Sequence, residues 1–165
     1  MPATTIRDAG DQDAAAIAAI ARPVIRDSAI TFTSAEKTPR SVCAEIAARR
    51  AAGQAFLVAE AGGALLGYAS YFQFRGGSGY ARTMEHTIVL APEARGRGVG
   101  RALMTELEAR ARAAGVHSLW AGVSAENPAG VAFHRAIGFA EVARLPQVGH
   151  KFGRFMDLIL LRKLL

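Results

Sequence analysis

The 165-residue chain has one cysteine, Cys43, and no long apolar run. A single thiol cannot form an internal disulfide, and a structural zinc site built on paired cysteines is excluded, so a reducing cytoplasm is the expected location. No apolar segment reaches the roughly 18 to 20 residues that a membrane-spanning helix needs. The alanine-rich stretch near the start follows Asp8, Asp11 and Asp13, whereas a secretory signal begins with a basic region. Neither a membrane nor a secretory destination is expected.

Internal repeats and low-complexity linkers are also lacking, so we expect one domain over residues 1–165. Apolar residues make up 51% of the chain and charged residues 21%, which is typical of a globular protein. The 20 Lys and Arg residues exceed the 14 Asp and Glu residues, and the net charge of +6 favours anionic partners. Charge alone does not choose among nucleic acid, an acidic surface and a phosphorylated cofactor.

The first half of the chain predicts a strand, two helices and a hairpin. The strand "TTIRDA" precedes a helix that begins near Asp13 and is expected to end or kink at Pro23. A second helix is expected to open at Thr38 as N-cap and to stop at Gly53. The turn Gly62-Gly63 between "AFLVAE" and "ALLGYASYF" predicts a β-hairpin.

The second half predicts a strand over "TMEHTIVLAP", a helix from Arg101 to Ala114, the strand "HSLWAGVS", a helix ending at Gly138, and one or two final strands. The whole order indicates an α/β fold with a largely antiparallel first half and a strand–helix–strand crossover behind it.

The segment "EARGRGVGRAL", residues 93–103, lies between the strand that ends at Pro92 and the helix that follows. Main-chain amides at a helix start lack internal partners, glycines let an anion approach closely, and the helix dipole adds positive potential. These features suit a pyrophosphate. The P-loop and the G-x-G-x-x-G dinucleotide pattern do not fit, because Arg101 and Leu103 stand where those motifs need other residues. A surface turn with solvated arginines remains the alternative.

"RGRGVG" resembles the Arg/Gln-x-x-Gly-x-Gly/Ala motif of the GNAT superfamily of acetyl-CoA-dependent N-acetyltransferases, with Arg95, Gly98 and Gly100 at the motif positions. The segments "TFTSAE", "GYASYFQFR", "AFHRAIGF" and "PQVGHKFGRFMDL" are similar to those of the phosphinothricin and methionine sulfone/sulfoximine N-acetyltransferases. This resemblance implies the GNAT fold, a mixed, mainly antiparallel twisted sheet that is flanked by helices and has a splayed central strand pair.

The resemblance further implies acetyl-CoA as cosubstrate and no metal. Its pyrophosphate and pantetheine would contact Ile88, Val89, Leu90, Arg95, Gly96, Arg97, Gly98, Val99, Gly100, Arg101 and Asn127. Asn127 also fits a plain helix N-cap, with Pro128 at the first helical position.

For catalysis, the resemblance and the chemistry of amine acetylation favour Glu85 as general base, with His86 as a second candidate. Strand alternation puts Glu85 and His86 on opposite faces. A salt bridge from Glu85 to Arg82 or Arg75 is the structural alternative. His134 stands where many GNAT enzymes have a tyrosine that protonates the thiolate, and an ordinary hydrogen-bonded helix histidine is equally consistent with the sequence.

The acceptor site implied by the resemblance consists of Phe32, Phe74, Arg75, Tyr80 and Glu85, and Arg75 suits an acidic group. The expected reaction is acetyl transfer to the α-amino group of a small amino acid or analogue. Another amine (a protein N-terminus or an aminoglycoside), turnover-free acyl-CoA binding and a basic nucleic-acid-binding module are alternatives. The resemblance also implies a homodimer, in which the partner subunit would add Lys151 or Phe155 to the site. Binding to nucleic acid is not expected.

Overall fold

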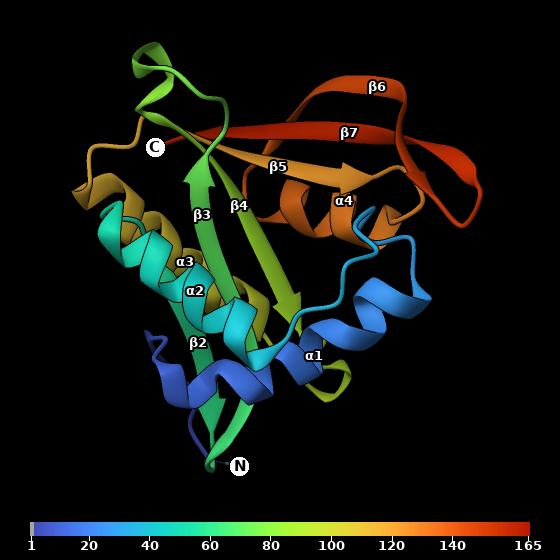
Figure 1. Ribbon diagram of the computed structural model, residues 1–165. Helices are drawn as coiled ribbons and strands as arrows, with labels where there is room; N and C mark the ends of the chain where they lie inside the picture. The colour runs from blue at the N-terminus through green and yellow to red at the C-terminus, as the bar shows by residue number, and fades with distance from the viewer. Residues whose placement is uncertain (1) are drawn as a thin grey trace.

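Seven strands form one twisted sheet in the computed structural model, which describes residues 2–165 (Figure 1). The order across the sheet is β1-β2-β3-β4-β5-β7-β6, and only β4 and β5 are parallel neighbours. The strands are β1 (Thr5–Asp8), β2 (Phe56–Ala61), β3 (Ala64–Gln73), β4 (Thr83–Leu90), β5 (Ser118–Ser124), β6 (Ala140–Lys151) and β7 (Arg154–Leu164). The helices are α1 (Ala14–Asp27), α2 (Pro39–Ala51), α3 (Val99–Ala113) and α4 (Pro128–Ala136).

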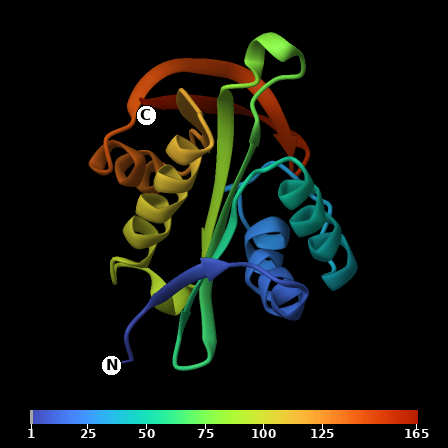
Figure 2. The same cartoon turned by 90° about the vertical axis from the view of Figure 1, so that its left-hand side faces the viewer.

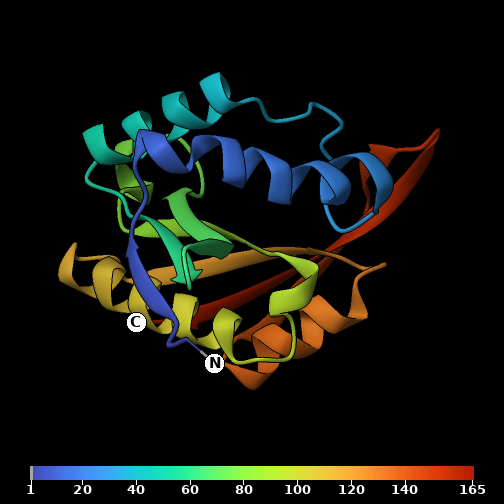
Figure 3. The ribbon, with the colours of Figure 1, turned by 90° about the horizontal axis from the view of Figure 1, so that it is seen from below.

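Helices cover both faces of the sheet. Figures 2 and 3 show α1 and α2 on one side of the strands and α3 and α4 on the other. The side-chain alternation of β2 connects the two layers: Leu57 and Ala59 belong to the core that contains α3, while Phe56 and Val58 belong to the core under α1 and α2. The predicted α/β architecture, with its mixed and mainly antiparallel sheet, is confirmed.

Most predicted element ends follow from local backbone chemistry. Thr38 Oγ1 accepts a hydrogen bond from the Ser41 amide at the start of α2. Gly62 and Gly63 adopt φ of +59° and +79° in the β2–β3 turn, a conformation that other residues rarely take. In the middle of α3, Leu103 is fully buried, as its spacing predicts.

Pro23 does not end the first helix, and that part of the prediction is wrong. The helix continues to Asp27 although proline removes one helical N–H. Val24 and Ile25, which follow the proline, are only 8% and 4% exposed. Burial of two such side chains stabilises the last turn by about 3–6 kcal/mol, which is as large as the penalty for the proline or larger.

The last two strands, β6 and β7, form a long antiparallel hairpin that projects beyond the helices (Figures 1 and 3). Its register shifts twice, between Glu141 and Ala143 and between Leu145 and Gly149. No helix within residues 2–165 is long and apolar enough to cross a membrane.

The parallel pair in the middle of the sheet is short. Pairing between β4 and β5 runs from Thr83 opposite Ser118 to Glu85 opposite Trp120 and then stops. Beyond Glu85 the two strands diverge, as Figure 1 shows. The main-chain groups of β4 that face this gap therefore have no ladder partner in β5, and the predicted splayed pair is confirmed.

Candidate active site

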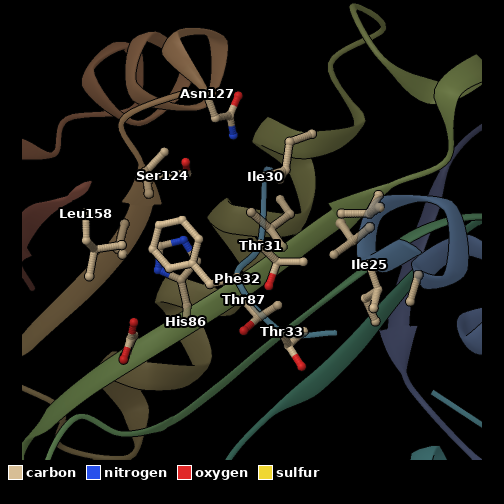
Figure 4. A pocket seen from close by; sticks show the side chains of 18 of the residues that line it. Ile25, Ile30, Thr31, Phe32, Thr33, His86, Thr87, Ser124, Asn127 and Leu158 are labelled. Carbon is tan, nitrogen blue, oxygen red and sulfur yellow. The ribbon is translucent and has the colours of Figure 1, made fainter. Parts of the chain in front are cut away.

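A first cavity of about 470 Å³ opens where β4 and β5 separate. Its walls come mainly from β4, β5, the end of α1 and the irregular segment between α1 and α2, with further side chains from β3, β7 and α4. Figure 4 shows several of these side chains around the space, among them Phe32, His86, Thr87, Ser124 and Asn127. The cavity between β4 and β5 is thus lined by apolar side chains from the helix layer and the sheet, together with a few polar side chains from the strands.

Glu85 lies in this wall at the last paired position of β4. Its carboxylate rests against Gly122 of β5, where a Cβ atom would come within 2.8 Å of Oε1. Burial raises the pKa of the Glu85 carboxyl above its ordinary value. Its carboxylate makes no hydrogen bond or ion pair with the rest of residues 2–165, so the alternative salt bridge to Arg82 or Arg75 does not form.

His86 and His134 form a hydrogen-bonded pair, with their Nε2 atoms 2.9 Å apart. His134 Nδ1 lies 2.7 Å from the Gly130 carbonyl oxygen, which can only accept, so Nδ1 carries a proton. Burial lowers the pKa of both rings, to about 3 for His86. In the neutral pair, His134 Nε2 is therefore the acceptor and His86 Nε2 the donor. His86 Nδ1 is buried near the Trp120 main chain and makes no hydrogen bond of normal geometry in the described chain.

A second cavity of about 550 Å³ adjoins the first along β4. Ile88, Val89, Asn127 and His134 belong to the walls of both cavities. At the far end, the second cavity is bounded by the loop that leads into α3. Gly98 has φ of +79° in that loop, and a Cβ added there would have no atom within 4 Å. The approach to the unpaired amides at the start of α3 is thus open.

Nine of the predicted cofactor residues line the second cavity: Ile88, Val89, Leu90, Arg95, Gly96, Gly98, Gly100, Arg101 and Asn127. Two others do not. Val99 is 3% exposed and packs into the core as the first residue of α3. Arg97 points along the loop, where its guanidinium donates to the Glu93 carbonyl oxygen at 3.2 Å.

Asn127 has the N-cap role that its position predicts, because its Oδ1 accepts from the Gly130 amide at 3.0 Å. The same side chain lies at the boundary of the two cavities. Its Nδ2 is not used by the cap, so capping and ligand binding employ different atoms of one carboxamide.

The predicted acceptor residues are only partly brought together. Phe32 and Glu85 line the first cavity, whereas Phe74, Arg75 and Tyr80 do not. Phe74 stacks on Trp120 with ring centroids 5.1 Å apart, and the Arg75 guanidinium lies over the Tyr80 ring at 5.6 Å. The exposed β3–β4 connection carries Arg75 and Tyr80 at the outer end of β4, away from the split.

Several wall residues were not identified from the sequence. Ile30, Thr31 and Thr33 come from a segment without periodicity, and Leu158 comes from β7. A signal did exist for Gly122, since a glycine inside a strand marks a close approach of another group. Lys151, expected to reach a partner subunit, instead binds carbonyl groups of its own chain.

The chain belongs to the acetyltransferase (GNAT) family, whose model matches residues 23–139. A Pseudomonas aeruginosa L-methionine sulfoximine/L-methionine sulfone acetyltransferase is 38% identical over 93% of this chain and 90% of its own. A phosphinothricin N-acetyltransferase from Alcaligenes faecalis is 37% identical over 98% of this chain and 82% of its own. The predicted family, subgroup and enzyme class are confirmed.

The fold agrees with solved structures. A Salmonella typhimurium acetyltransferase, solved with its cofactor acetyl-CoA, superposes with a TM-score of 0.93 at 35% identity, covering 98% of this chain and 94% of that one.

Across residues 2–165 no cluster of three or more His, Cys, Asp or Glu side chains is placed to hold a metal ion.

Proposed function

We propose that this protein transfers the acetyl group of acetyl-CoA to the α-amino group of a small amino acid or amino-acid analogue. The observation that carries the proposal is the position of Glu85, whose carboxylate lines the first cavity, without a partner in the described chain, where β4 and β5 separate, on the strand whose Ile88 and Val89 line both cavities. The relatives, by name, acetylate methionine sulfoximine, methionine sulfone and phosphinothricin. We extend that substrate class to this chain.

The second cavity fits acetyl-CoA in its donor set. Main-chain amides of residues 96–101 and the guanidinium groups of Arg95 and Arg101 would hold the pyrophosphate. The unpaired edge of β4 at Ile88–Leu90 would pair with the amides of the pantetheine arm, as an added strand does. When bound there, acetyl-CoA supplies the thioester that the amine attacks.

Within the first cavity, Glu85 would accept the proton of the incoming ammonium group, because only the neutral amine is nucleophilic. Its raised pKa makes the carboxylate a stronger base near neutral pH than an exposed glutamate. A main-chain amide of Val89 or Leu90 would face the thioester oxygen.

His134 is the proposed proton donor to the leaving thiolate, with His86 behind it. In the neutral pair its Nε2 carries no proton, and its Nδ1 proton is bound to the Gly130 carbonyl. Donation by His134 therefore requires the pair to gain or rearrange a proton first. This requirement separates His134 from a tyrosine, whose hydroxyl carries a proton throughout.

An acceptor screen tests the function. Purified protein with acetyl-CoA and methionine sulfone, methionine sulfoximine, phosphinothricin, an aminoglycoside or an N-terminal peptide should release thiol with the small amino-acid analogues. Thiol release with the peptide or the aminoglycoside alone would instead indicate an N-acetyltransferase for protein N-termini or aminoglycosides. An Arg75→Ala variant with unchanged turnover would show that this exposed arginine does not hold the acceptor's acid group.

We also propose that two copies associate through the β6–β7 hairpin. Val148, Phe152 and Phe155 are 56%, 56% and 64% exposed on it, which is unusual for large apolar side chains on one element. Light scattering during size-exclusion chromatography should give the dimer mass for the wild type and the monomer mass for Phe155→Glu. A monomeric wild type would contradict this part.

The cytoplasm is the proposed location. Cys43 is free and half-buried in α2, and burial raises the pKa of its thiol, which keeps it in the less reactive form. Such a thiol is compatible with a reducing compartment.

A further inference from the structure

Lys151, the last residue of β6, has an unusual environment for a lysine. Its side chain is 5% exposed, and Nζ donates to the Ser28 carbonyl at 2.6 Å and the Thr31 carbonyl at 2.9 Å. No carboxylate among residues 2–165 pairs with it. A buried ammonium without an acidic partner is unfavourable unless its hydrogen bonds are satisfied. The two carbonyl groups, together with the Phe152 ring whose centroid is 5.0 Å from Nζ, are therefore what this lysine binds.

These carbonyl groups belong to the segment between α1 and α2, which contains neither helix nor strand from Ser28 to Thr38. Such a segment has no ladder or helix of its own to fix its main chain, so side chains from elsewhere must do so. In Figures 1 and 3 the segment runs beside the β6–β7 hairpin. Lys151 is 123 positions from Ser28 in the sequence and joins these two parts of the chain.

Gly149 makes a second contact on the same segment. A Cβ at Gly149 would lie 2.3 to 2.6 Å from atoms of the Phe32 ring, so the ring is seated directly on the strand main chain. Gly149 and Lys151 are two residues apart on β6 and share one face of the strand. Lys151 holds the segment by donating hydrogen bonds to its carbonyl groups. Gly149 lets the Phe32 ring pack against the strand because it has no side chain.

The segment held in this way is a wall of the first cavity. Thr31, Phe32 and Thr33 line it together with Thr87 of β4 (Figure 4). Glu85 also lines this cavity. Because Phe32 and Glu85 line the same cavity, a shift of the Phe32 ring would change the room available to an acceptor there. The loop that precedes α3, at the far end of the second cavity, has no contact with Lys151.

We propose that Lys151 is a positioning residue that, with Gly149, fixes the Phe32 wall and thereby determines which acceptor side chains fit beside Glu85. This assignment rests on the proposed function, because it takes the first cavity as the acceptor site. The contact of Lys151 with its own chain also distinguishes the proposal from a role for this lysine across a dimer interface.

The test uses Lys151→Met, which keeps the length of the side chain and removes its donors, and Lys151→Arg, which keeps donors. Lys163→Met is the control, because Lys163 Nζ also binds a main-chain carbonyl, that of Ile137 at 2.7 Å, and lines neither cavity. It differs from Lys151 in that it also pairs with the Glu108 carboxylate at 2.8 Å. Each variant is assayed for KM and kcat with methionine sulfone and phosphinothricin, for the dissociation constant of acetyl-CoA, and for Tm.

Loss of two hydrogen bonds to a charged donor should raise the acceptor KM of Lys151→Met by about tenfold or more. The preference between the two acceptors should change, and Lys151→Arg should recover part of the loss. Acetyl-CoA affinity should change less than acceptor KM, because Ile30 is the one residue among 28–33 that lines the second cavity. Gly149→Ala, which displaces the ring without touching Lys151, should change the same preference. Lys163→Met should lower Tm without changing acceptor KM.

Hydrogen–deuterium exchange provides a readout independent of acetyl transfer. Amides of residues 29–33 should exchange faster in Lys151→Met than in the wild type or Lys163→Met. Wild-type acceptor KM and preference in folded Lys151→Met and Gly149→Ala would overturn the proposal. If the wild type releases no thiol with any acceptor while exchange still rises in Lys151→Met, the proposed function fails and the contact itself stands.

Discussion

Gly98→Ala should weaken acetyl-CoA binding through backbone strain alone. Gly98 has φ of +79°, where an L-residue costs about 1–2 kcal/mol, yet an added Cβ would meet no atom within 4 Å. Residues 95–98 are exposed, so the free loop of the variant can relax to a conformation with negative φ. To bind acetyl-CoA, the loop must regain positive φ at residue 98, which costs the same 1–2 kcal/mol of binding free energy. The dissociation constant should therefore be about 5- to 30-fold higher.

Two further variants isolate the cause. Gly53 has φ of +68° after α2 and also has nothing within 4 Å of its Cβ position, but it lines neither cavity. Gly53→Ala should therefore lower Tm and leave acetyl-CoA affinity unchanged. Gly98→Asn should lose less affinity than Gly98→Ala, because asparagine tolerates positive φ better than alanine does.

Isothermal titration calorimetry with acetyl-CoA, with Tm measured alongside, checks this reasoning. Arg97→Ala is the decisive comparison, because Arg97 does not line the second cavity and its guanidinium binds the Glu93 carbonyl. If Arg97→Ala weakens binding more than Gly98→Ala does, side-chain charge and not the course of the main chain determines affinity. Wild-type affinity in Gly98→Ala at unchanged Tm would refute the strain argument itself.

Glu85→Gln should lower kcat/KM about 10²- to 10⁴-fold with unchanged acetyl-CoA affinity. The acidic limb of the wild-type pH–rate profile should lie above the range of an exposed glutamate, since burial raises the pKa of Glu85, and survival of that limb in the variant would exclude Glu85 as the base. Gly122→Ala places a Cβ 2.8 Å from Glu85 Oε1, so steady-state kinetics should show a lower kcat, and a normal kcat would mean that the carboxylate need not rest there. His86 has a folded-state pKa of about 3, so its contribution to stability is complete above the unfolded pKa near 6.5 and is lost as pH falls toward 3. Between pH 7 and pH 5 the free energy of unfolding, measured with urea, should fall by about 2 kcal/mol less in His86→Phe than in the wild type. An equal fall in both proteins would contradict the low pKa of His86.

The elements that could be predicted from sequence are those whose signals are local. Thr38 and Asn127 cap helices through side-chain oxygens within three residues, and Gly53 and Gly138 stop helices with positive φ. The place of Glu85 on the strand before the glycine-rich loop also depends only on neighbours in sequence, whereas its role as general base rests on the resemblance and stays a prediction. Resemblance supplied the identity of the ligand, which local physics had left as a generic anion.

The parts that could not be predicted depend on long-range contacts. Pro23 predicts a helix end from sequence, but burial of Val24 and Ile25 in the folded protein lets the helix continue. The wall formed by Phe32 depends on Gly149 and Lys151, more than a hundred residues later, and no local pattern links them. The divergence of β4 from β5 was expected only from the resemblance, since a strand pattern does not state where pairing stops.

The pairing of β4 changes at Glu85. Up to Glu85 the main chain of β4 is paired on both sides, with β3 and β5; beyond it, only β3 remains. The unpaired edge is what an extended ligand can join, and the last paired residue carries the carboxylate. A thioester bound along that edge would therefore lie near Glu85 without any loop having to bring the two together. Lengthening the β4–β5 ladder past residue 85 should therefore remove cosubstrate binding and the access of Glu85 to the acceptor together, whereas changes at Phe32, which lines the first cavity and not the second, should affect the acceptor alone.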